Sequence, residues 1–415
     1  MTEFYDTLET RSPAERAAQL FAALPAQVAH AQRASTAFAA ILAGVDGARV
    51  DSRAALARLP VTRKGELMQR QQAQVASDPF GGFSTLVRGP AMPHVFASPG
   101  PIYEPDGAAR DYWRVGRAMF AAGFRAGDLV HNAFSYHMTP GAFIMESGAH
   151  AVGCTVFPAG VGQTEQQLQA IAELRPVAYA GTPSFLRILV EKAQEAGSDI
   201  ASLRKGLVGG EAFPPSLRDW FQERGMAVYQ SYATADLGLI AYETSSREGM
   251  VVDEGVIVEI VRPGTGDPVA PGEVGEVVVT TLNPAYPLVR FGTGDLSAVL
   301  PGEDPTGRTN MRIRGWLGRA DQTTKIRGMF VHPGQVAEIA RRFPEIARAR
   351  LVVSGEMAND VMTLMVEAAG AAEGLAARIG EAVRDVTKLR AEVRLVAPGS
   401  LPNDGKVIED ARSYK

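Results

Sequence analysis

Tyr232 and Asp236, in the segment QSYATADLG (230–238), have the side chains needed to bind a nucleotide and a metal ion. The segment follows an apolar run that we expect to be a strand, and open α/β sheets bind ligands at the carboxyl ends of such strands. An aromatic ring can stack on a base, and a carboxylate can hold Mg²⁺. The pair indicates a nucleotide and metal site, although an ordinary loop explains the segment equally well.

Two glycine-rich segments could shape the same site. GLVGGEAF (206–213) places Gly209 and Gly210 at the end of another predicted strand, followed by Glu211. Glycines let a flat base approach the backbone closely, although a simple turn is the more frequent meaning of such a segment. In LVRFGTGDLS (288–297), a turn presents Asp295, whose carboxylate could accept hydrogen bonds from two neighbouring ribose hydroxyls.

Two further segments carry cations near the carboxyl end of the chain. GWLGRADQTTKIRG (315–328) contains Arg319 and Asp321, and LPNDGKVIED (401–410) presents Lys406 on a loop framed by proline and glycine. Taken alone, Lys406 is most simply a solvent-exposed surface lysine. These five segments are individually weak, so their joint order along the chain has to carry the interpretation.

A sixth segment, HVFASPGPIYEP (94–105), has the small residues, glycine and prolines that are typical of a phosphate-binding loop after a short strand. The hydroxyl groups and the cation expected in such a loop are missing. The segment is therefore a nucleotide site, an altered nucleotide site, or only a turn.

Other chemistries receive little support from the sequence. The six histidines show no metal-ligand spacing, and no GxSxG motif of a hydrolase is present. Cys154 is the single cysteine and lies in the apolar run AVGCTVFP, which favours a buried structural thiol over a nucleophile. A single cysteine also excludes internal disulfides and suits a reducing cytoplasm.

The length and charge of the chain narrow the possible classes of protein further. With 415 residues, 21% of them charged, and a net charge of −4, the chain is typical of a globular enzyme with one large and one smaller domain. This charge argues against a nucleic-acid partner, while a small acidic substrate needs only a few local cations. The polar N-terminus lacks the features of a signal peptide, and no apolar run approaches the ~18 residues of a membrane span. We therefore predict a cytoplasmic protein.

The hydrophobic pattern predicts the elements that position these residues. Helical spacing runs from Ser12 to about Leu42, and helices alternate with apolar runs from about 110 to 240, which indicates a doubly wound, mostly parallel α/β sheet. A period of two after about 250 indicates an antiparallel β subdomain. An α-β-β-α-β order follows and predicts a small α+β C-terminal domain on a hinge. We expect residues 1–318 and 319–415 to form the two domains.

The motifs, in this order and with the domain break at the fourth, resemble the adenylate-forming ligase superfamily and, within it, the phenylacetate-CoA ligase family. The resemblance covers nearly the whole chain, including YDTLETRSPAER (5–16), LPVTRKGEL (59–67) and NAFSYHMTPGAFIMESGAHAVGCTVFPAGVGQTEQQL (132–168). It implies an AMP-forming ligase that activates an aromatic or arylacetic acid as an acyl adenylate and transfers it to coenzyme A, with ATP and Mg²⁺ as cofactors. No carrier domain is appended, so free coenzyme A is favoured as the thiol, and a homodimer is compatible with the sequence.

The resemblance implies a role for each nucleotide-site residue. Gly209, Gly210 and Glu211 match the adenine-side strand end of the family. Tyr232 matches the tyrosine that stacks on adenine, and Asp295 matches the aspartate that binds the ribose.

It implies catalytic and moving parts as well. Asp236 occupies a position where the family usually has a glutamate that binds Mg²⁺, and the shorter side chain keeps the charge. Arg319 matches the arginine partner of the ribose aspartate, and Asp321 matches the hinge about which the small domain turns. Lys406 matches the lysine that contacts the carboxylate and the α-phosphate during adenylation.

Acid selectivity is expected in the loop FSYHMTPGAF (134–143). Tyr136, His137 and Met138 offer aromatic and polarizable walls, and Gly141 leaves room for an aryl or arylacetic acid. The alternative, that these residues belong to the core, is about equally favoured.

The phosphate loop departs from the family pattern, which usually reads A-S-S-G-T-T-G-K-P. Ser98 and Gly100 are kept, but Tyr103 stands at the second glycine and Glu104 at the lysine. Two like charges about 4 Å apart repel by about 4 kcal/mol at an effective dielectric near 20, so Glu104 cannot simply face a triphosphate.

Three hypotheses follow from this departure. In the first, Glu104 faces away or reaches the metal, and Lys64 of VTRKGEL (61–67) supplies the phosphate cation. In the second, adenylation is slow and the enzyme works mainly in the thioester direction. In the third, the chain is a nucleotide- or acyl-CoA-binding relative whose ligase activity is weak or lost because of the altered loop Ser98–Pro105.

Overall fold

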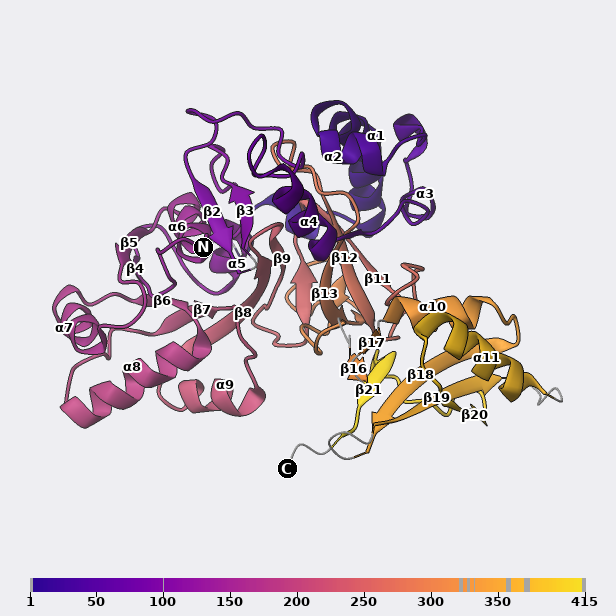
Figure 1. Ribbon diagram of the computed structural model, residues 1–415. Helices are drawn as coiled ribbons and strands as arrows, with labels where there is room; N and C mark the ends of the chain where they lie inside the picture. Colours follow the sequence, from indigo (N-terminus) through magenta and orange to yellow (C-terminus); the bar gives the residue numbers. More distant parts are fainter. Residues whose placement is uncertain are drawn as a thin grey trace. The chain divides into compact units, whose positions relative to one another are not determined.

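The computed structural model describes residues 3–99, 101–320, 324–326, 329–331, 333–355, 360–368 and 374–412. The chain forms two compact units (Figure 1). The first consists of Met1–Val258, Val279–Thr293 and Leu300–Trp316, and the second of Glu259–Val278, Gly294–Val299 and Leu317–Lys415. A domain boundary between 318 and 319 stays a prediction. Within the described residues, no helix is both long and apolar enough to span a membrane.

The N-terminal helical region begins where its capping box predicts. Ser12 accepts a hydrogen bond from the backbone N–H of Glu15, and the Glu15 carboxylate accepts one from the backbone N–H of Ser12. The predicted helical region from Ser12 to about Leu42 is divided at Ser35, whose hydroxyl accepts a hydrogen bond from the backbone N–H of Phe38 and caps a second helix. The elements of this region are η1 (Thr7–Thr10), α1 (Pro13–Ala34), α2 (Thr36–Ile41), η2 (Gly47–Arg49), α3 (Arg53–Leu56), β1 (Thr62–Arg63) and α4 (Lys64–Gln74).

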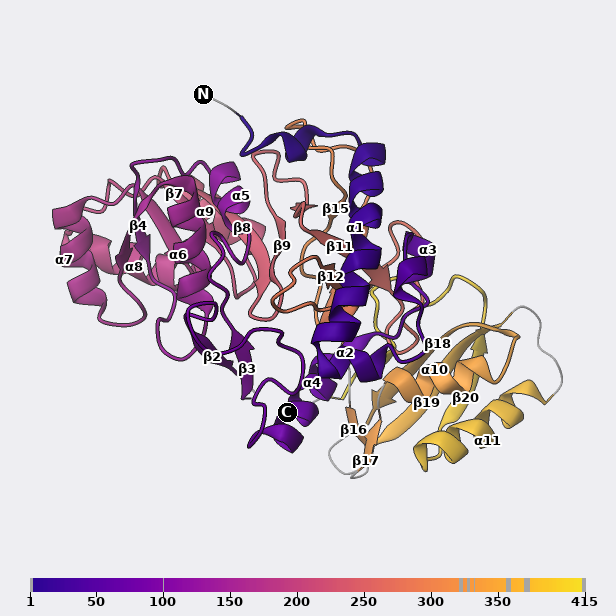
Figure 2. The same ribbon diagram turned by 90° about the horizontal axis from the view of Figure 1, so that it is seen from above.

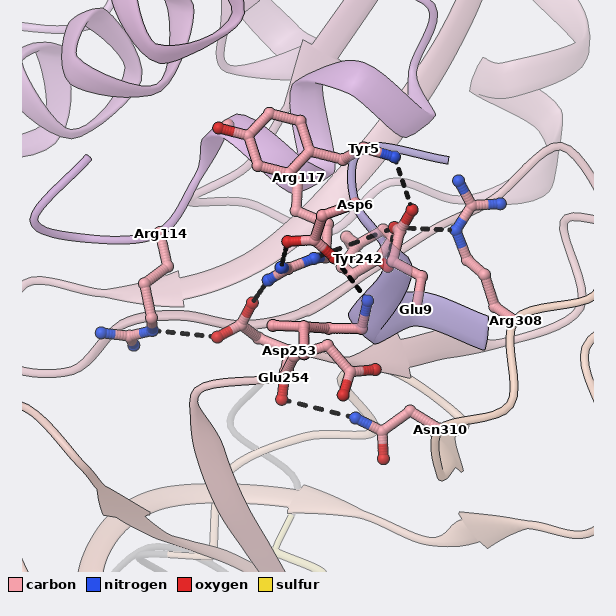
Figure 3. Close-up of polar contacts among 12 residues, drawn as sticks. Tyr5, Asp6, Glu9, Arg114, Arg117, Tyr242, Asp253, Glu254, Arg308 and Asn310 are labelled. Carbon is pink, nitrogen blue, oxygen red and sulfur yellow. Dashed lines mark hydrogen bonds and ion pairs between the residues drawn. The ribbon is translucent and has the colours of Figure 1, made fainter. Parts of the chain in front are cut away.

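A buried ionic network fixes the start of the chain to the first unit (Figure 3). The Glu9 carboxylate accepts hydrogen bonds from Tyr242 Oη at 2.8 Å and from Arg308 Nε at 3.1 Å. Asp253 Oδ2 accepts one from Arg117 at 2.8 Å. Because buried carboxylates are stable only when they are paired, this network holds the N-terminal segment in place.

The large sheet confirms the predicted doubly wound region. Its strand order is β14–β15–β10–β9–β8–β7–β6–β4–β5, and β5, β4, β6, β7 and β8 run parallel, whereas β9, β10 and β15 continue it antiparallel. The strand bounds are β4 (Leu129–Asn132), β5 (Thr155–Pro158), β6 (Ala178–Gly181), β7 (Lys205–Val208), β8 (Ala227–Thr234), β9 (Gly238–Tyr242), β10 (Met250–Val252), β14 (Val299–Leu300) and β15 (Arg312–Ile313).

Helices pack on both faces of the parallel strands (Figure 1). Successive strand residues belong to different cores, since Leu207 packs with α5 and α6 whereas Val208 packs with α7, α8 and α9. Cys154 lies in the first of these cores, and burial raises its thiol pKa to about 11, as expected of a structural thiol. The helices are α5 (Gly116–Ala121), α6 (Gly141–Val152), α7 (Thr164–Leu174), α8 (Pro183–Ala196) and α9 (Pro215–Gln222).

The segments with a period of two form a smaller sheet of order β1–β13–β12–β11. Its strands are β11 (Val256–Val261), β12 (Gly275–Thr281) and β13 (Phe291–Ser297), with β1 pairing parallel to β13. Helix α1 runs beside these strands (Figure 2), where Gln27 donates hydrogen bonds to the backbone oxygens of Thr281 and Asn283.

The C-terminal region confirms the predicted α-β-β-α-β order and adds three short strands, β16 and β17 before it and β21 after it. Its sheet has the order β20–β19–β18–β21, and one hydrophobic core joins this sheet to both helices. The short strand β21 has too few residues for a period-two pattern. The elements are β16 (Thr324–Ile326), β17 (Met329–Val331), α10 (Pro333–Arg341), β18 (Ile346–Ser354), β19 (Val361–Ala368), α11 (Leu375–Thr387), β20 (Glu392–Val396) and β21 (Ile408–Asp410).

Candidate active site

A cavity of about 200 Å³ lies at the carboxyl ends of the parallel strands in the first unit. The chain order switches at β4, because β5 pairs on one side of β4 and β6 on the other, and ligands of open α/β sheets bind at such switch points. Its walls come from four segments that are far apart in the sequence: Ser98, Pro99, Phe134, Thr139, Pro140, Gly141, Ile144, Met145, Gly209, Gly210, Ser231, Ala233, Thr234 and Ala235.

The glycine pair that follows β7 lines this cavity. A Cβ atom at Gly209 would lie 3.2 Å from both the backbone oxygen and the hydroxyl of Ser231, so a side chain would press on the neighbouring strand. Gly210 has a φ of +78°, which favours glycine. Glu211 is exposed, and its carboxylate accepts a hydrogen bond from the backbone N–H of Ser184 at 3.4 Å. The backbone therefore stays open to a flat ligand at this edge.

The segment after the glycine pair carries the predicted base-stacking and metal-binding residues. Tyr232 lies on β8, and its hydroxyl donates to Thr293 Oγ1 at 3.1 Å. Asp236 lies in the short connection between β8 and β9, directly after the cavity residue Ala235. The strand end thus brings Asp236 to the cavity edge.

The altered phosphate loop is a tight β-hairpin of β2 (Val95–Ser98) and β3 (Ile102–Pro105), in which Phe96 pairs with Glu104. Gln71 of α4 fixes β3 by two hydrogen bonds of 2.8 Å, one to the backbone N–H and one to the backbone oxygen of Tyr103. Side chains alternate along a strand, so this anchor directs Glu104 inward. Gly100, a predicted phosphate-site residue, lies outside the described residues.

Glu104 belongs to a cluster of ionizable groups beside the cavity. Its side chain is only 2% exposed, and its Oε1 accepts a hydrogen bond from Ser98 Oγ at 2.6 Å. Asp236 is 7% exposed, and Lys64 Nζ lies 3.0 Å from its Oδ2. Burial, followed by the nearby charge of Asp236, raises the pKa of Glu104 to about 8. The loop glutamate is therefore an acid that keeps its proton at neutral pH.

The position of Lys64 has an electrostatic reason. It is the first residue of α4, where a cation is disfavoured by the helix dipole, typically by 0.3–1 kcal/mol. The buried carboxylate of Asp236 offsets this cost. The pairing brings a cation from a distant part of the chain to the place where the phosphate loop itself has none.

The predicted acid-pocket residues divide into two groups. Gly141 lines the cavity, whereas Tyr136, His137 and Met138 are not among its lining residues. The Tyr136 hydroxyl donates to Glu146 at 2.6 Å and accepts from Asn132 at 2.8 Å. Met138 has a φ of +63° and is 63% exposed, because the tight turn before α6 carries its side chain to the surface.

Three apolar wall residues were missed from the sequence. Phe134, Ile144 and Met145 line the cavity, and the last two lie on the first turns of α6. Helical periodicity explains them, because residues 141, 144 and 145 share one face of a helix that begins at Gly141.

The second unit contains the predicted ribose-binding pair. Arg319 donates to Asp295 Oδ1 at 2.8 Å, and the two residues also form an isolated antiparallel bridge. Gly294 has a φ of +73°, and a Cβ there would lie 2.8 Å from the Arg319 guanidinium. The glycine turn is therefore what lets the arginine approach. Asp321, the predicted hinge, lies outside the described residues.

Lys406 is exposed on a well-braced loop of the second unit. Its backbone N–H donates to Asp404, and Arg350 pairs with both Asp404 and Glu409. Gly405 has a φ of +70°, and a Cβ there would lie 2.6 Å from Val274, so the loop tolerates no side chain at this position. These contacts fix the backbone of the loop and leave the lysine side chain exposed.

Two family models match parts of the chain. The AMP-binding enzyme family matches residues 110–285, and the AMP-binding enzyme C-terminal domain matches residues 328–411. A phenylacetate-coenzyme A ligase of Aromatoleum evansii is 32% identical, covering 78% of this chain and 74% of its own length. A phenylacetate-coenzyme A ligase of Thermus thermophilus is 30% identical, covering 87% of both chains.

The fold is shared with a solved ligase. An open conformation of 2-hydroxyisobutyryl-CoA ligase, in complex with 2-HIB-AMP and CoA, has a TM-score of 0.73 at 26% identity and covers 97% of this chain and 92% of its own. The sequence relatives and this solved structure are all ligases that act on coenzyme A. The chain therefore belongs to the AMP-binding enzyme family and is an AMP-forming acid–CoA ligase.

Proposed function

We propose that the chain joins an aromatic or arylacetic acid to coenzyme A through an acyl adenylate. The observation that carries this proposal is the cavity of about 200 Å³ at the strand ends, which has apolar walls and lies beside the Lys64–Asp236 pair. The phenylacetate-coenzyme A ligases among its relatives support an aryl acid.

The acid's ring fits the apolar part of the cavity. Phe134, Ile144 and Met145 offer a hydrophobic wall, and a Cβ at Gly210 or Gly141 would come within 3.7 or 3.4 Å of Phe134. Both glycines therefore keep a slot open next to an aromatic ring, which suits a flat substrate. In this proposal Tyr136, His137 and Met138 act at the cavity mouth or on the loop conformation rather than as its walls.

The nucleotide is assigned to the residues around the same strand ends. Tyr232 would stack on adenine beside Gly209, Gly210 and Glu211. Ser98 would meet the phosphates, as would Gly100, and Lys64 would supply the cation that the loop lacks. In the second unit, Asp295 and Arg319 would bind the ribose hydroxyls.

The fit of Mg²⁺ to this site can be tested on Asp236. Its Oδ1 is buried and has no hydrogen-bond partner among the described residues, and carboxylate oxygens are preferred Mg²⁺ ligands. The residue fits, so Asp236 would hold the ion. Mg²⁺, when bound, offsets the negative charge of the triphosphate.

The proposed reaction has two steps. A carboxylate oxygen of the acid attacks the α-phosphorus of ATP, the bond to the bridging oxygen breaks, and pyrophosphate leaves. The thiol sulfur of coenzyme A then attacks the acyl carbon, AMP leaves, and the thiol proton passes to solvent. Lys406 would neutralise the two anions that meet in the first step, and residues 319–415 would turn about Asp321 before the second.

A panel of acids tests the function directly. Aromatic, arylacetic and short aliphatic acids are assayed for AMP release with and without coenzyme A. We expect release with an aryl or arylacetic acid and thioester only when coenzyme A is present. If no acid gives AMP release, the chain is instead a nucleotide- or acyl-CoA-binding relative.

The two lysines can be tested by acid-dependent ATP–pyrophosphate exchange. Lys64→Ala and Lys406→Ala should each lower the exchange rate by 10²-fold or more, because each removes a cation from the approach of two anions. Arg175→Ala, at an exposed surface pair with Asp199, serves as the control and should leave exchange unchanged. Normal exchange by Lys64→Ala would refute its role at the phosphates.

A further inference from the structure

The buried carboxyl groups of Glu104 and Asp236 lie together and accept few hydrogen bonds from other residues. Glu104 Oε2 and Asp236 Oδ1 are both enclosed by protein, and neither has a hydrogen-bond partner in the described part of the chain. Their other oxygens are occupied, Glu104 Oε1 by Ser98 and Asp236 Oδ2 by Lys64. The two side chains lie within hydrogen-bonding distance of each other, and because buried polar atoms are almost always paired, these two oxygens must hold a common proton or a common ligand.

A third oxygen has the same property. The hydroxyl of Tyr286 is buried without a partner among the residues described. The hydroxyl lies within electrostatic range of the Asp236 and Glu104 carboxyl groups. Carboxylate and hydroxyl oxygens are the atoms that a hard divalent cation prefers as ligands.

The chemistry of the cluster favours a cation over a water molecule. When both carboxyl groups are ionised they carry two negative charges, and Lys64 supplies one positive charge from a side chain that is 37% exposed. A divalent cation would compensate the remainder, which water cannot.

The place of the cluster connects it to the cavity. Ser98, which holds Glu104, lines the cavity, and so does Ala235, the residue before Asp236. Mg²⁺ sites commonly use one or two carboxylates and leave the remaining positions to water and substrate phosphates. Two protein carboxylates next to a ligand cavity fit this pattern, although no group of three or more acidic, histidine or cysteine side chains forms a complete metal site in the described ranges.

We propose that Glu104 is a second carboxylate ligand, with Asp236, of one divalent cation at the phosphate end of the cavity. The loop then brings its positive charge as a bound metal ion instead of a lysine. The inference rests on the proposed function only for the identity of the phosphate ligand that completes the cation's coordination.

The test measures metal binding without any reaction. Mn²⁺ is titrated into the full-length, nucleotide-free protein at pH 7.5, and free Mn²⁺ is followed by electron paramagnetic resonance. We expect one saturable site in the wild type, with affinity at least 10-fold lower in both Glu104→Gln and Asp236→Asn. Asp106→Asn is the matched control, because this buried acid near the end of the same hairpin is paired with His94 at 2.7 Å. Its Mn²⁺ affinity should stay within 2-fold of the wild type.

Folding and function are controlled separately. Glu104→Gln should unfold in EDTA at or above the wild-type temperature, so its weaker binding cannot be attributed to misfolding. A wild type without saturable Mn²⁺ binding, or a Glu104→Gln variant that binds as tightly, overturns the proposal. If the metal-site proposal is overturned but AMP release is normal, the proposed function stands. If Mn²⁺ binds through Glu104 but no acid gives AMP release, the proposed function fails and the metal site stands.

Discussion

Two buried charge clusters of the first unit differ in how completely their carboxylates are paired. In the network of Figure 3, Glu9 accepts from Tyr242 and Arg308 on one oxygen and from the backbone N–H of Tyr5 on the other. Asp253 is likewise paired on both oxygens. At the cavity, Glu104 and Asp236 each keep one buried oxygen without a partner among the described residues.

This difference separates a structural role from a functional one. A network whose carboxylates are paired makes the folded state specific, and removing one member leaves a buried charge behind. An incompletely paired cluster destabilises the fold unless something binds there, and strongly shifted pKa values gather at such sites. Substitutions in the paired network should therefore lower stability, and substitutions in the cavity cluster should raise it.

The largest effect is expected in the paired network. Asp253→Asn should lower the free energy of unfolding by about 3–5 kcal/mol, because Arg117 and Arg114 lose the charge that compensates them in the interior. Urea denaturation at pH 7 measures the change. Asp199→Ala, which breaks the exposed pair with Arg175, is the control and should stay within about 0.5 kcal/mol. A loss below 1 kcal/mol for Asp253→Asn would remove the distinction between the clusters.

Glu104→Gln should act in the opposite direction at alkaline pH. Burial beside Asp236 raises the pKa of Glu104 from 4.5 to about 8, so the unfolded chain releases this proton first as the pH rises. The protonated Glu104 side chain therefore stabilises the folded state fully below pH 4.5, its pKa in the unfolded chain. This stabilisation is lost as the pH rises towards 8, by at most about 1.4 kcal/mol per pH unit.

Glutamine imitates the protonated acid and removes this loss. In EDTA at pH 8, the variant should be more stable than the wild type by on the order of 2 kcal/mol, and the difference should vanish near pH 4.5. Urea midpoints across this range measure it. If the variant is less stable than the wild type at pH 8, the Glu104 carboxylate is as completely paired as the Glu9 carboxylate.

Glu104→Lys tests the cavity cluster with a ligand. It restores the cation that the family has in this loop and, at pH 9, where the wild-type carboxyl group is ionised, removes a like charge from the approach of a triphosphate. Metal-free ATP should bind about 10-fold more tightly, equivalent to about 1.4 kcal/mol, as measured by calorimetry in EDTA. Asp106→Asn should leave this affinity unchanged, and equal or weaker binding by Glu104→Lys would count against the repulsion argument.

The smallest effect is expected from Ser98→Ala. The Ser98 hydroxyl donates to Glu104 Oε1 at 2.6 Å, and this hydrogen bond lowers the glutamate pKa against the larger influence of burial. Without this hydrogen bond, the pKa of Glu104 should rise further. The pH at which the protein stops losing stability should then increase by less than about one unit. An unchanged pH profile would mean that the serine does not control the proton.

Much of the fold could be predicted from local patterns. The C-terminal helix at Leu375–Thr387 and the strand at Val361–Ala368 lie where their periods of 3.6 and 2 indicate. Strand β1 has two residues and β21 three, so neither produces a period. The break in the first helix depends on a cap at Ser35, which a long apolar pattern conceals.

The candidate site was predicted less completely. Asp236 and the glycine pair follow strand ends, and Tyr232 lies on β8 close to its end, so a ligand edge can be inferred from these positions alone. The wall residues Phe134 and Met145 could have been found once the start of α6 was known. The turn at Met138 could not, because a positive φ at a non-glycine residue has no local signal.

By itself, the sequence determined the kinds of elements, their order, and the residues capable of binding a nucleotide, because periodicity and motif spacing are local properties. Only the tertiary structure decided that Lys64 would reach Asp236, 172 residues away, and that Glu104 would be buried beside both. The cause is packing. The contacts of α4, the hairpin and the end of β8 decide which charges meet, and neighbouring charges together with burial determine whether a carboxyl group holds a proton, a partner or a metal ion.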